Sequence, residues 1–138
     1  MPAKDIAIKN VETADPDDPV AEIATRMADG GVGSVVVTED HRPVGIVTDR
    51  DLAVRVLAAG ADPDGLCAGD VMTADPATAR STAGVLELAA AICEAGVRRM
   101  PIVDDGDHIV GIVTLDDLLL LFVEELDELS EVIATASH

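Results

Sequence analysis

One short pattern, Gly-Ile-Val-Thr-x-x-Asp, occurs twice in the chain and offers its clearest chemistry. It spans residues 45–51 and again residues 111–117. A Thr followed three residues later by an Asp is typical of a helix N-terminus, where the Thr hydroxyl accepts a hydrogen bond from a backbone N–H. The free N–H groups of such a turn also attract phosphate, and a neighbouring carboxylate can accept hydrogen bonds from ribose hydroxyls. The pattern therefore predicts either two helix caps or two sites for a phosphorylated sugar.

The two patterns belong to a longer internal repeat. Thr13 and Gly31 recur as Thr78 and Gly96, at an offset of 65 residues, and the pattern at 45–51 recurs at 111–117 after one inserted residue in a turn. Such a repeat predicts two copies of one structural unit. We divide the chain into a first copy at 5–59, a linker at 60–69, a second copy at 70–123, and a helical extension with its tail at 124–138.

Each copy has the residue pattern of a βαββα unit. Val20, Ile23 and Met27 have helical spacing, and the glycines that follow are typical of helix ends. β-Branched runs on either side of a polar turn predict a hairpin in each copy. The first copy is expected to have a strand at 11–14, a helix at 19–29, strands at 34–38 and 44–47 around a turn at 39–43, and a helix at 49–59. The second copy is expected to have a strand at 77–79, a helix ended by Gly96, strands at 100–103 and 109–113, and a helix from 115 to about 132.

These units predict an α/β (α+β) fold in which the two copies pack sheet to sheet. A unit of this size leaves one face of its sheet exposed, and two units can bury those faces against each other. The arrangement implies pseudo-twofold symmetry with two equivalent clefts between the copies.

At this point the sequence resembles the cystathionine β-synthase (CBS) domain, which usually occurs as a tandem pair called a Bateman module. The resemblance covers residues 5 to about 122 and rests on the phrases GVGSVVVTEDHRPVGIVTDRDL and GVRRMPIVDDGDHIVGIVTLDDL, with Asp-Val-Met-Thr at 70–73. The first copy departs from the pattern, because it has Val36 where the second has Pro101, and its segment 5–8 matches weakly.

The resemblance implies a regulatory module that binds an adenosine nucleotide or a related adenosyl metabolite between the two copies. In such modules the Asp binds ribose, the Thr binds phosphate or ribose, and a strand of the other copy frames the adenine. AMP, ADP, ATP, NAD and S-adenosylmethionine all remain candidate ligands, and no cofactor is required. The first cleft would comprise Thr48, Arg50, Asp51, Ala77, Val97, Arg98 and Arg99, and the second Asn10, Glu12, Val32, Gly33, Ser34, Thr114, Asp116 and Asp117.

Charge distinguishes these two clefts. Three arginines in the first suit phosphate oxygens, whereas three carboxylates in the second oppose a polyanion. We therefore expect a nucleotide to prefer the first cleft. The competing interpretation is that Arg98 and Arg99 only form surface ion pairs in a very acidic protein.

The composition excludes several partners. The 138 residues include 27 acidic and 9 basic side chains, a net charge of −18, with Phe122 as the single aromatic residue. Such a chain repels nucleic acid and anionic membranes and has almost nothing to stack on a base. We expect a cytoplasmic protein with no membrane segment, and the acidic surface favours a salt-loving source.

No pattern of a catalytic or metal site is present. Cys67 and Cys93 stand apart, His41 and His108 have no ligand-spaced partners, and Asp104, Asp105 and Asp107 do not complete a calcium loop. We therefore expect a protein that is not an enzyme and binds no metal. A fragment related to inosine-monophosphate dehydrogenase would share kinship and not activity, since no catalytic barrel fits in this length.

Two functions remain open. In the first, the ligand shifts the relative angle of the two copies and a regulated protein partner responds. In the second, the chain is a structural homodimerisation or assembly module with no metabolite. The C-terminal helix supports a homodimer in either case, because Phe122, Leu126, Leu129 and Ile133 form an apolar stripe along it.

Overall fold

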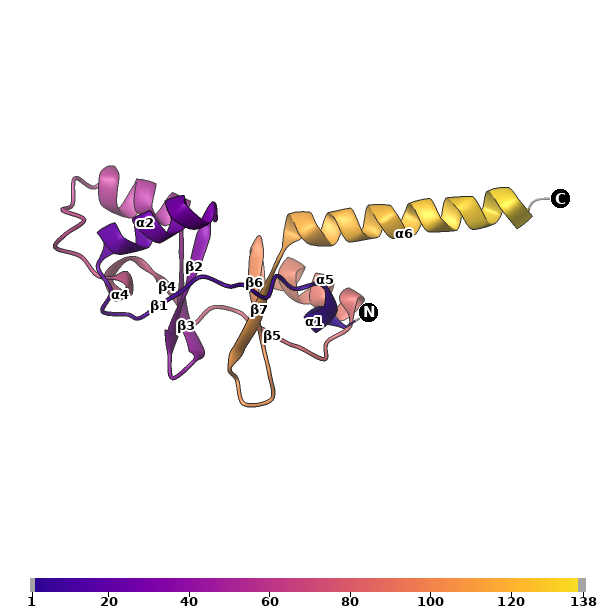
Figure 1. Ribbon diagram of the computed structural model, residues 1–138, viewed down its shortest axis with the longest axis horizontal. Coiled ribbons are helices and arrows are strands. Elements are labelled where there is room, and N and C mark those ends of the chain that lie inside the picture. The colour runs from indigo at the N-terminus through magenta and orange to yellow at the C-terminus, as the bar shows by residue number, and fades with distance from the viewer. Residues whose placement is uncertain (1, 137–138) are drawn as a thin grey trace.

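The computed structural model describes residues 2–136, which form two similar halves side by side (Figure 1). The first half contains β1 (Thr13–Ala14), α2 (Val20–Gly30), β2 (Ser34–Glu39), β3 (Arg42–Thr48), α3 (Asp49–Asp51) and η1 (Leu52–Leu57). The second contains β5 (Ala79–Arg80), α5 (Val85–Ala95), β6 (Arg99–Val103), β7 (Ile109–Thr114) and α6 (Leu115–Ala136). Of three further short elements, α1 (Ala3–Ile6) lies at the start of the first copy, and α4 (Ala68–Val71) and β4 (Thr73–Ala74) lie at the start of the second.

The helices and hairpins follow the expected pattern. α2 and α5 end at Gly31 and Gly96, whose φ angles of 63° and 65° lie in the left-handed region that glycine adopts without strain. β2 and β3 pair antiparallel, as do β6 and β7, and β1 and β5 each join their hairpin in parallel. The expected tandem fold is therefore confirmed.

The two leading segments, residues 3–8 and 68–74, are exchanged between the halves. β4, from the start of the second copy, pairs with β3 of the first, with Thr73 opposite Ile46. At the equivalent place in the second half, Ile8 pairs with Ile112 through two backbone hydrogen bonds of 2.9 and 3.0 Å. The sheets consequently have the orders β1-β2-β3-β4 and β5-β6-β7, and each copy is completed by a segment from the other.

The exchange extends into the cores. Ala68 and Val71 of α4 are buried with Ile23 of α2 in the first core, and Ala3 of α1 is buried with Leu88 of α5 in the second. Glycine makes one of these crossings possible, because a Cβ on Gly111 would lie 2.7 Å from the Cβ of Ala7.

A third buried layer lies between the two sheets. Val36 on β2 and Pro101 on β6 occupy equivalent positions, and both are fully buried although neither belongs to a helix-covered core. Side chains alternate between the faces of a strand, so these two residues point away from the helices and toward the other half. The halves therefore pack sheet to sheet with pseudo-twofold symmetry, as Figure 1 shows.

Several predicted boundaries were wrong. The first hairpin turns at Asp40 and His41, whose positive φ angles of 52° and 65° permit a tight reversal, so the predicted turn at 39–43 was too long. The helix expected at 49–59 is α-helical only over Asp49–Asp51 and continues as a π-helix over Leu52–Leu57. The strands expected at 11–14 and 77–79 are the two-residue β1 and β5, because only those residues pair with a neighbour. The last helix runs on to Ala136 instead of ending near residue 132.

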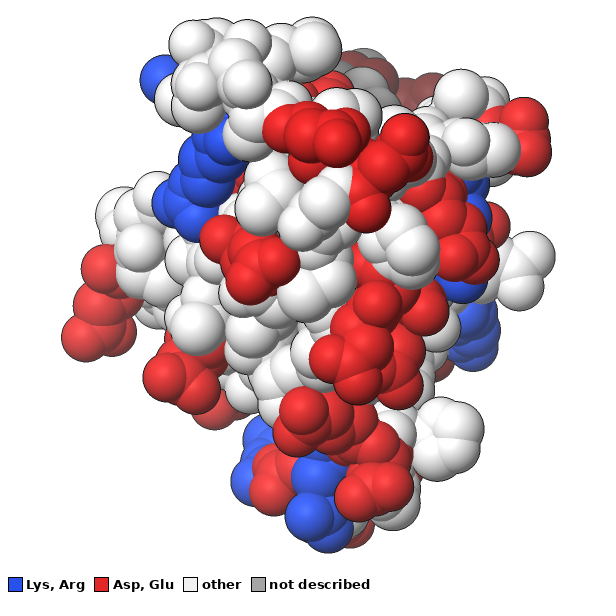
Figure 2. Space-filling view, turned by 90° about the vertical axis from the view of Figure 1, so that its left-hand side faces the viewer, with Lys and Arg blue, Asp and Glu red and all other residues white. Residues whose placement is uncertain are grey.

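The surface is acidic and carries one long projection. Acidic side chains are spread over the end of the molecule formed by the first half (Figure 2). At the opposite end, α6 extends well beyond the body of the second half (Figure 1). Among the described residues, no helix is long and apolar enough to cross a membrane.

Candidate functional site

The second cleft contains a cavity of about 240 Å³ between the two halves. It is bounded by β7 on one side and by the segment preceding β2 on the other. Of the residues expected there, the cavity is lined by Asn10, Glu12, Val32, Gly33, Ser34 and Thr114, with Arg99 in addition. Asp116 and Asp117 do not line it.

The first cleft contains a cavity of about 280 Å³ related to the other by the pseudo-twofold axis. Ala77, Val97 and Arg99 line it, together with Ile46 and Pro101. Thr48, Arg50, Asp51 and Arg98 do not.

Arg99 is the residue common to both cavities. It is half-buried at the start of β6, and its side chain has no hydrogen bond or ion pair with any residue that the structure describes. A Cβ built on Gly33 would lie 2.9 Å from the Arg99 Nη2 and 3.1 Å from the Asp49 Oδ2, so the guanidinium reaches across to the first half. Ser34 is the residue of the first copy that corresponds to Arg99 in the second. Because the first copy has no arginine at this position, only one arginine lies between the two clefts.

The other arginines assigned to the first cleft lie elsewhere. Arg98 is exposed and forms an ion pair with Asp116 at 3.4 Å, beside an apolar cavity between α5 and α6. Arg50 is exposed at the start of α3 and lines neither cleft. Each cavity therefore has one arginine and one carboxylate, Glu12 in the second and Asp75 in the first, and the electrostatic preference expected for the first cleft has no support in this arrangement.

The two Thr-x-x-Asp pairs form the expected helix caps, but their carboxylates differ. Thr48 Oγ1 accepts a hydrogen bond from the Asp51 N–H at 3.2 Å, and Asp51 Oδ2 accepts one from the Thr48 N–H at 2.9 Å. The second carboxylate oxygen of Asp51 lies 3.8 Å from Arg55 Nε. Thr114 Oγ1 accepts from the Asp117 N–H at 3.1 Å in the same way. The Asp117 carboxylate, however, has no partner among the described residues. Asp117 lines a separate surface hollow that shares Ile8 with the second cleft.

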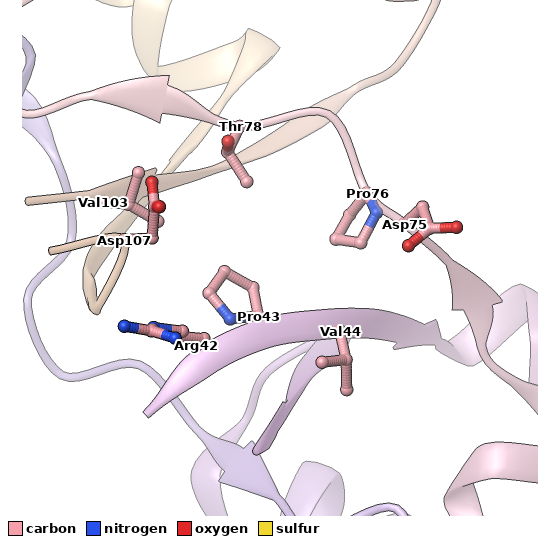
Figure 3. Close-up of a pocket in the computed structure, with 8 residues that line it drawn as sticks. All are labelled: Arg42, Pro43, Val44, Asp75, Pro76, Thr78, Val103 and Asp107. Carbon is pink, nitrogen blue, oxygen red and sulfur yellow. The ribbon is translucent and has the colours of Figure 1, made fainter. Parts of the chain in front are cut away.

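A third cavity, of about 390 Å³, lies between the halves near the hairpin tips (Figure 3). Arg42, Pro43 and Val44 of β3 form one wall, and Asp75, Pro76 and Thr78 form the wall opposite. It shares Asp75 and Pro76 with the first cleft, so the two cavities adjoin. Nothing in the sequence pattern had indicated this cavity, because its residues belong to turns and strand ends.

The hairpin tips also contact each other. The Ile109 N–H donates to the His41 carbonyl at 2.8 Å, and the His41 and His108 rings lie edge to face with centroids 6.4 Å apart. These two contacts fix the relative position of the halves at one edge.

Within the second tip, the backbone N–H groups of His108 and Gly106 donate to the Asp104 carboxylate and hold its pKa below the usual range. Among the described residues, no group of three or more His, Cys, Asp or Glu side chains is arranged to hold a metal ion.

The chain belongs to the CBS domain family, whose model matches residues 3–58 and 68–124. An uncharacterized protein of Methanopyrus kandleri is 40% identical over 116 residues, which is 83% of this chain and 59% of that protein. The crystal structure of Hypoxic Response Protein I with two coordinated zinc ions has a TM-score of 0.77 at 29% identity and covers 86% of this chain and 97% of its own. A hexameric CBS-CP12 protein from bloom-forming cyanobacteria has a TM-score of 0.78 at 25% identity, and the match covers 99% of this chain and 84% of that one.

Some relatives are much longer proteins. An inosine-5'-monophosphate dehydrogenase of Thermoplasma acidophilum is 31% identical over 114 residues, but the chain spans only 22% of its length. That enzyme's name therefore reflects its other parts. The chain itself is a tandem CBS pair, similar in structure to proteins made of CBS pairs.

Proposed function

We propose that the protein is a regulatory module that binds an adenosine nucleotide or a related adenosyl metabolite in the second cleft. The observation that carries this proposal is the Arg99 guanidinium, which lies between both clefts without a partner. In a chain of net charge −18, the half-buried Arg99 forms no ion pair with any described carboxylate, although the Asp49 Oδ2 lies near the same point as the Arg99 Nη2, beside Gly33. An anionic group of the ligand is its natural partner, since Arg binds phosphate and carboxylate oxygens through paired hydrogen bonds.

The geometry favours the second cleft over the first. There Thr114 lines the cavity, and the nearby Asp117 carboxylate is free to accept hydrogen bonds from ribose hydroxyls. Asp51, the counterpart that does not line the first cavity, is already engaged by the Thr48 N–H and lies near Arg55, so recruiting it would cost those contacts. The base would pack against aliphatic side chains such as Val32 and Ile112, because no aromatic residue lines either cavity. We expect modest affinity for that reason.

Occupation of the cleft would alter the angle between the halves. Arg99 comes from β6 of one half and Gly33 from the other, so a ligand held by both favours one relative position. A partner protein that recognises this position would receive the signal.

Thermal unfolding of the full chain in high salt, with and without AMP, ADP, ATP, NAD or S-adenosylmethionine, tests the proposal. A ligand at about 100 times its dissociation constant adds about 2.7 kcal/mol to the free energy of unfolding. Arg99→Gln should abolish the gain. Arg98→Gln is the matched control, because the neighbouring arginine lines neither cleft and should leave the gain unchanged.

Two further variants test the choice of cleft. Asp117→Ala should weaken binding, whereas Asp51→Ala should lower stability and leave the ligand-induced gain intact. Gly33→Ala should also weaken binding at little cost in stability, because its new methyl group displaces only the side-chain ends of Arg99 and Asp49. If none of the five ligands raises the midpoint, nucleotide sensing is rejected.

The second candidate function is that of an assembly module without a metabolite ligand. The observation in its favour is the exposed apolar side of α6, with Leu126 65% and Ile133 68% exposed. The structural similarity to a hexameric CBS-CP12 protein adds support for oligomerisation. An unchanged midpoint with every nucleotide, together with a stable oligomer, would favour this function.

A further inference from the structure

The C-terminal part of α6 has an apolar face that no residue between 2 and 136 covers. Seven large apolar side chains of this helix are between 54% and 68% exposed. They are spread along α6, which extends well beyond the body of the second half (Figure 1). Single exposed leucines are common, but a continuous stripe of this length normally lies in an interface. The seven residues are Leu119, Leu120, Val123, Leu126, Leu129, Val132 and Ile133.

The stripe follows the spacing of a coiled coil. From Leu115 onward, the apolar positions alternate in steps of four and three residues, which is the heptad pattern that keeps one seam facing a partner helix. An amphipathic helix that merely covered a globular core would have no reason to maintain this pattern beyond the core. The seam consists of Leu115, Leu119, Phe122, Leu126, Leu129, Ile133 and Ala136. At its base, Leu115 and Phe122 also pack against the second core.

The charges on the helix identify the partner. Residues 115–136 contain seven acidic residues and no basic one. In the projecting part, Glu124, Asp127, Glu128 and Glu131 occupy the three heptad positions farthest from the seam, and Glu125 alone is acidic beside it. The other positions beside the projecting seam are Val123, Ser130 and Val132. A basic partner would be matched by carboxylates next to the seam, where charged pairs form between helices. An uncharged border with the acids outside instead suits a second identical helix.

We propose that α6 pairs with the α6 of a second copy of this chain along the seam, and that this pairing makes the protein a homodimer. The seam continues at the base of the helix into an apolar cavity of about 490 Å³ bordered by Leu118, Leu119 and Phe122. Dimerisation strengthens with salt, because screening reduces the repulsion between two bodies of net charge −18.

Sedimentation equilibrium of the full chain at low and high KCl tests the inference. Leu126→Asp and Leu129→Asp each place a charge in the seam and should raise the dissociation constant at least about tenfold. Leu120→Asp is the matched control, because Leu120 lies on the same helix and is 62% exposed, close to the 65% of Leu126, but stands outside the seam. The control should keep the dimer mass. Both seam variants should remain folded as monomers and unfold cooperatively, since the replaced side chains are exposed.

A monomer mass for the wild-type chain at every concentration and salt would overturn the inference. Equal weakening by Leu120→Asp and Leu126→Asp would also overturn it, since the apolar surface would then act without a seam. The outcome is independent of nucleotide binding. A chain that dimerises without binding any nucleotide, or binds one as a monomer, separates the two proposals.

Discussion

Replacing Gly111 by alanine tests whether the leading segment of the first copy is seated on the second sheet. Gly111 is buried on β7, and an added Cβ would lie 2.7 Å from the Ala7 Cβ and 3.1 Å from the Ile8 carbonyl oxygen. Neither atom belongs to a flexible side-chain end, so the backbone of one segment must shift. Overpacking of this kind costs about 1–3 kcal/mol. Replacing a strand glycine regains about 0.5–1 kcal/mol of that, which leaves a net loss of about 0.5–2 kcal/mol.

Urea unfolding of the full chain measures this loss as a lower midpoint at an unchanged slope. In a thermal scan it corresponds to a midpoint about 2–6 °C lower for a chain of this size. Adding Ala7→Gly to the Gly111→Ala variant removes the closest contact and should recover about 1 kcal/mol in a double-mutant cycle. Gly65→Ala is the control, because its nearest neighbour would be an ordinary contact at 3.6 Å and stability should hardly change.

The reasoning is refuted if Gly111→Ala unfolds within about 0.3 kcal/mol of the wild type. It is also refuted if the destabilisation of the double variant equals the sum of those caused by Ala7→Gly and Gly111→Ala alone. Either result would mean that residues 3–8 are not packed across β7.

Four other outcomes are expected. Leu88→Ala should cost about 2–5 kcal/mol in urea unfolding because Leu88 is fully buried, and a loss below about 1 kcal/mol would contradict the assigned core. Thr48→Ala should cost about 1 kcal/mol through its lost cap, measured by thermal unfolding, whereas Asp117→Ala should cost little because its carboxylate has no partner; equal losses would disprove the distinction. The lowered pKa of Asp104 means that this carboxylate stabilises the fold above the ordinary pKa of Asp, and that the contribution disappears as the pH falls through the lowered value. The midpoints of wild type and Asp104→Ala should therefore converge in acid, and a constant gap would exclude this linkage. Finally, the unfolding midpoint should rise with KCl as the net charge of −18 is screened, and a midpoint that is flat or falls would argue against adaptation to salt.

The sequence was sufficient for the elements that have a side-chain pattern. The helical spacing of Val20, Ile23 and Met27 and the glycine after it predicted α2, and the β-branched runs predicted both hairpins. The Thr caps were predictable for the same reason, since they depend on two residues three positions apart. Each of these signals is local, and tertiary packing reinforced it.

The exchanged segments were not predictable, because their contacts join distant backbone groups. Ile8 and Ile112 pair through N–H and carbonyl groups that every residue has, so no residue type marks the pairing. α1 and α4 have four residues each, too few to show a helical period. For the π-helical residues 52–57 we find no sequence signal that distinguishes them from an ordinary helix.

The arginine pair shows a different limit of sequence reasoning. Arg98 and Arg99 are adjacent at the start of a strand, where neighbouring side chains point to opposite faces. Only one of the two therefore lies between the clefts. Counting both as ligands of one cleft overlooked this alternation, which the sequence itself contained.

The exchange also bears on how such a protein could arise. A chain with a single copy could complete its sheet only by lending its leading segment to another molecule and borrowing one in return, as in a domain-swapped dimer. Its folding would then depend on protein concentration. Joining two copies in one chain makes the exchange of leading segments intramolecular. Each half can then complete its sheet at any protein concentration.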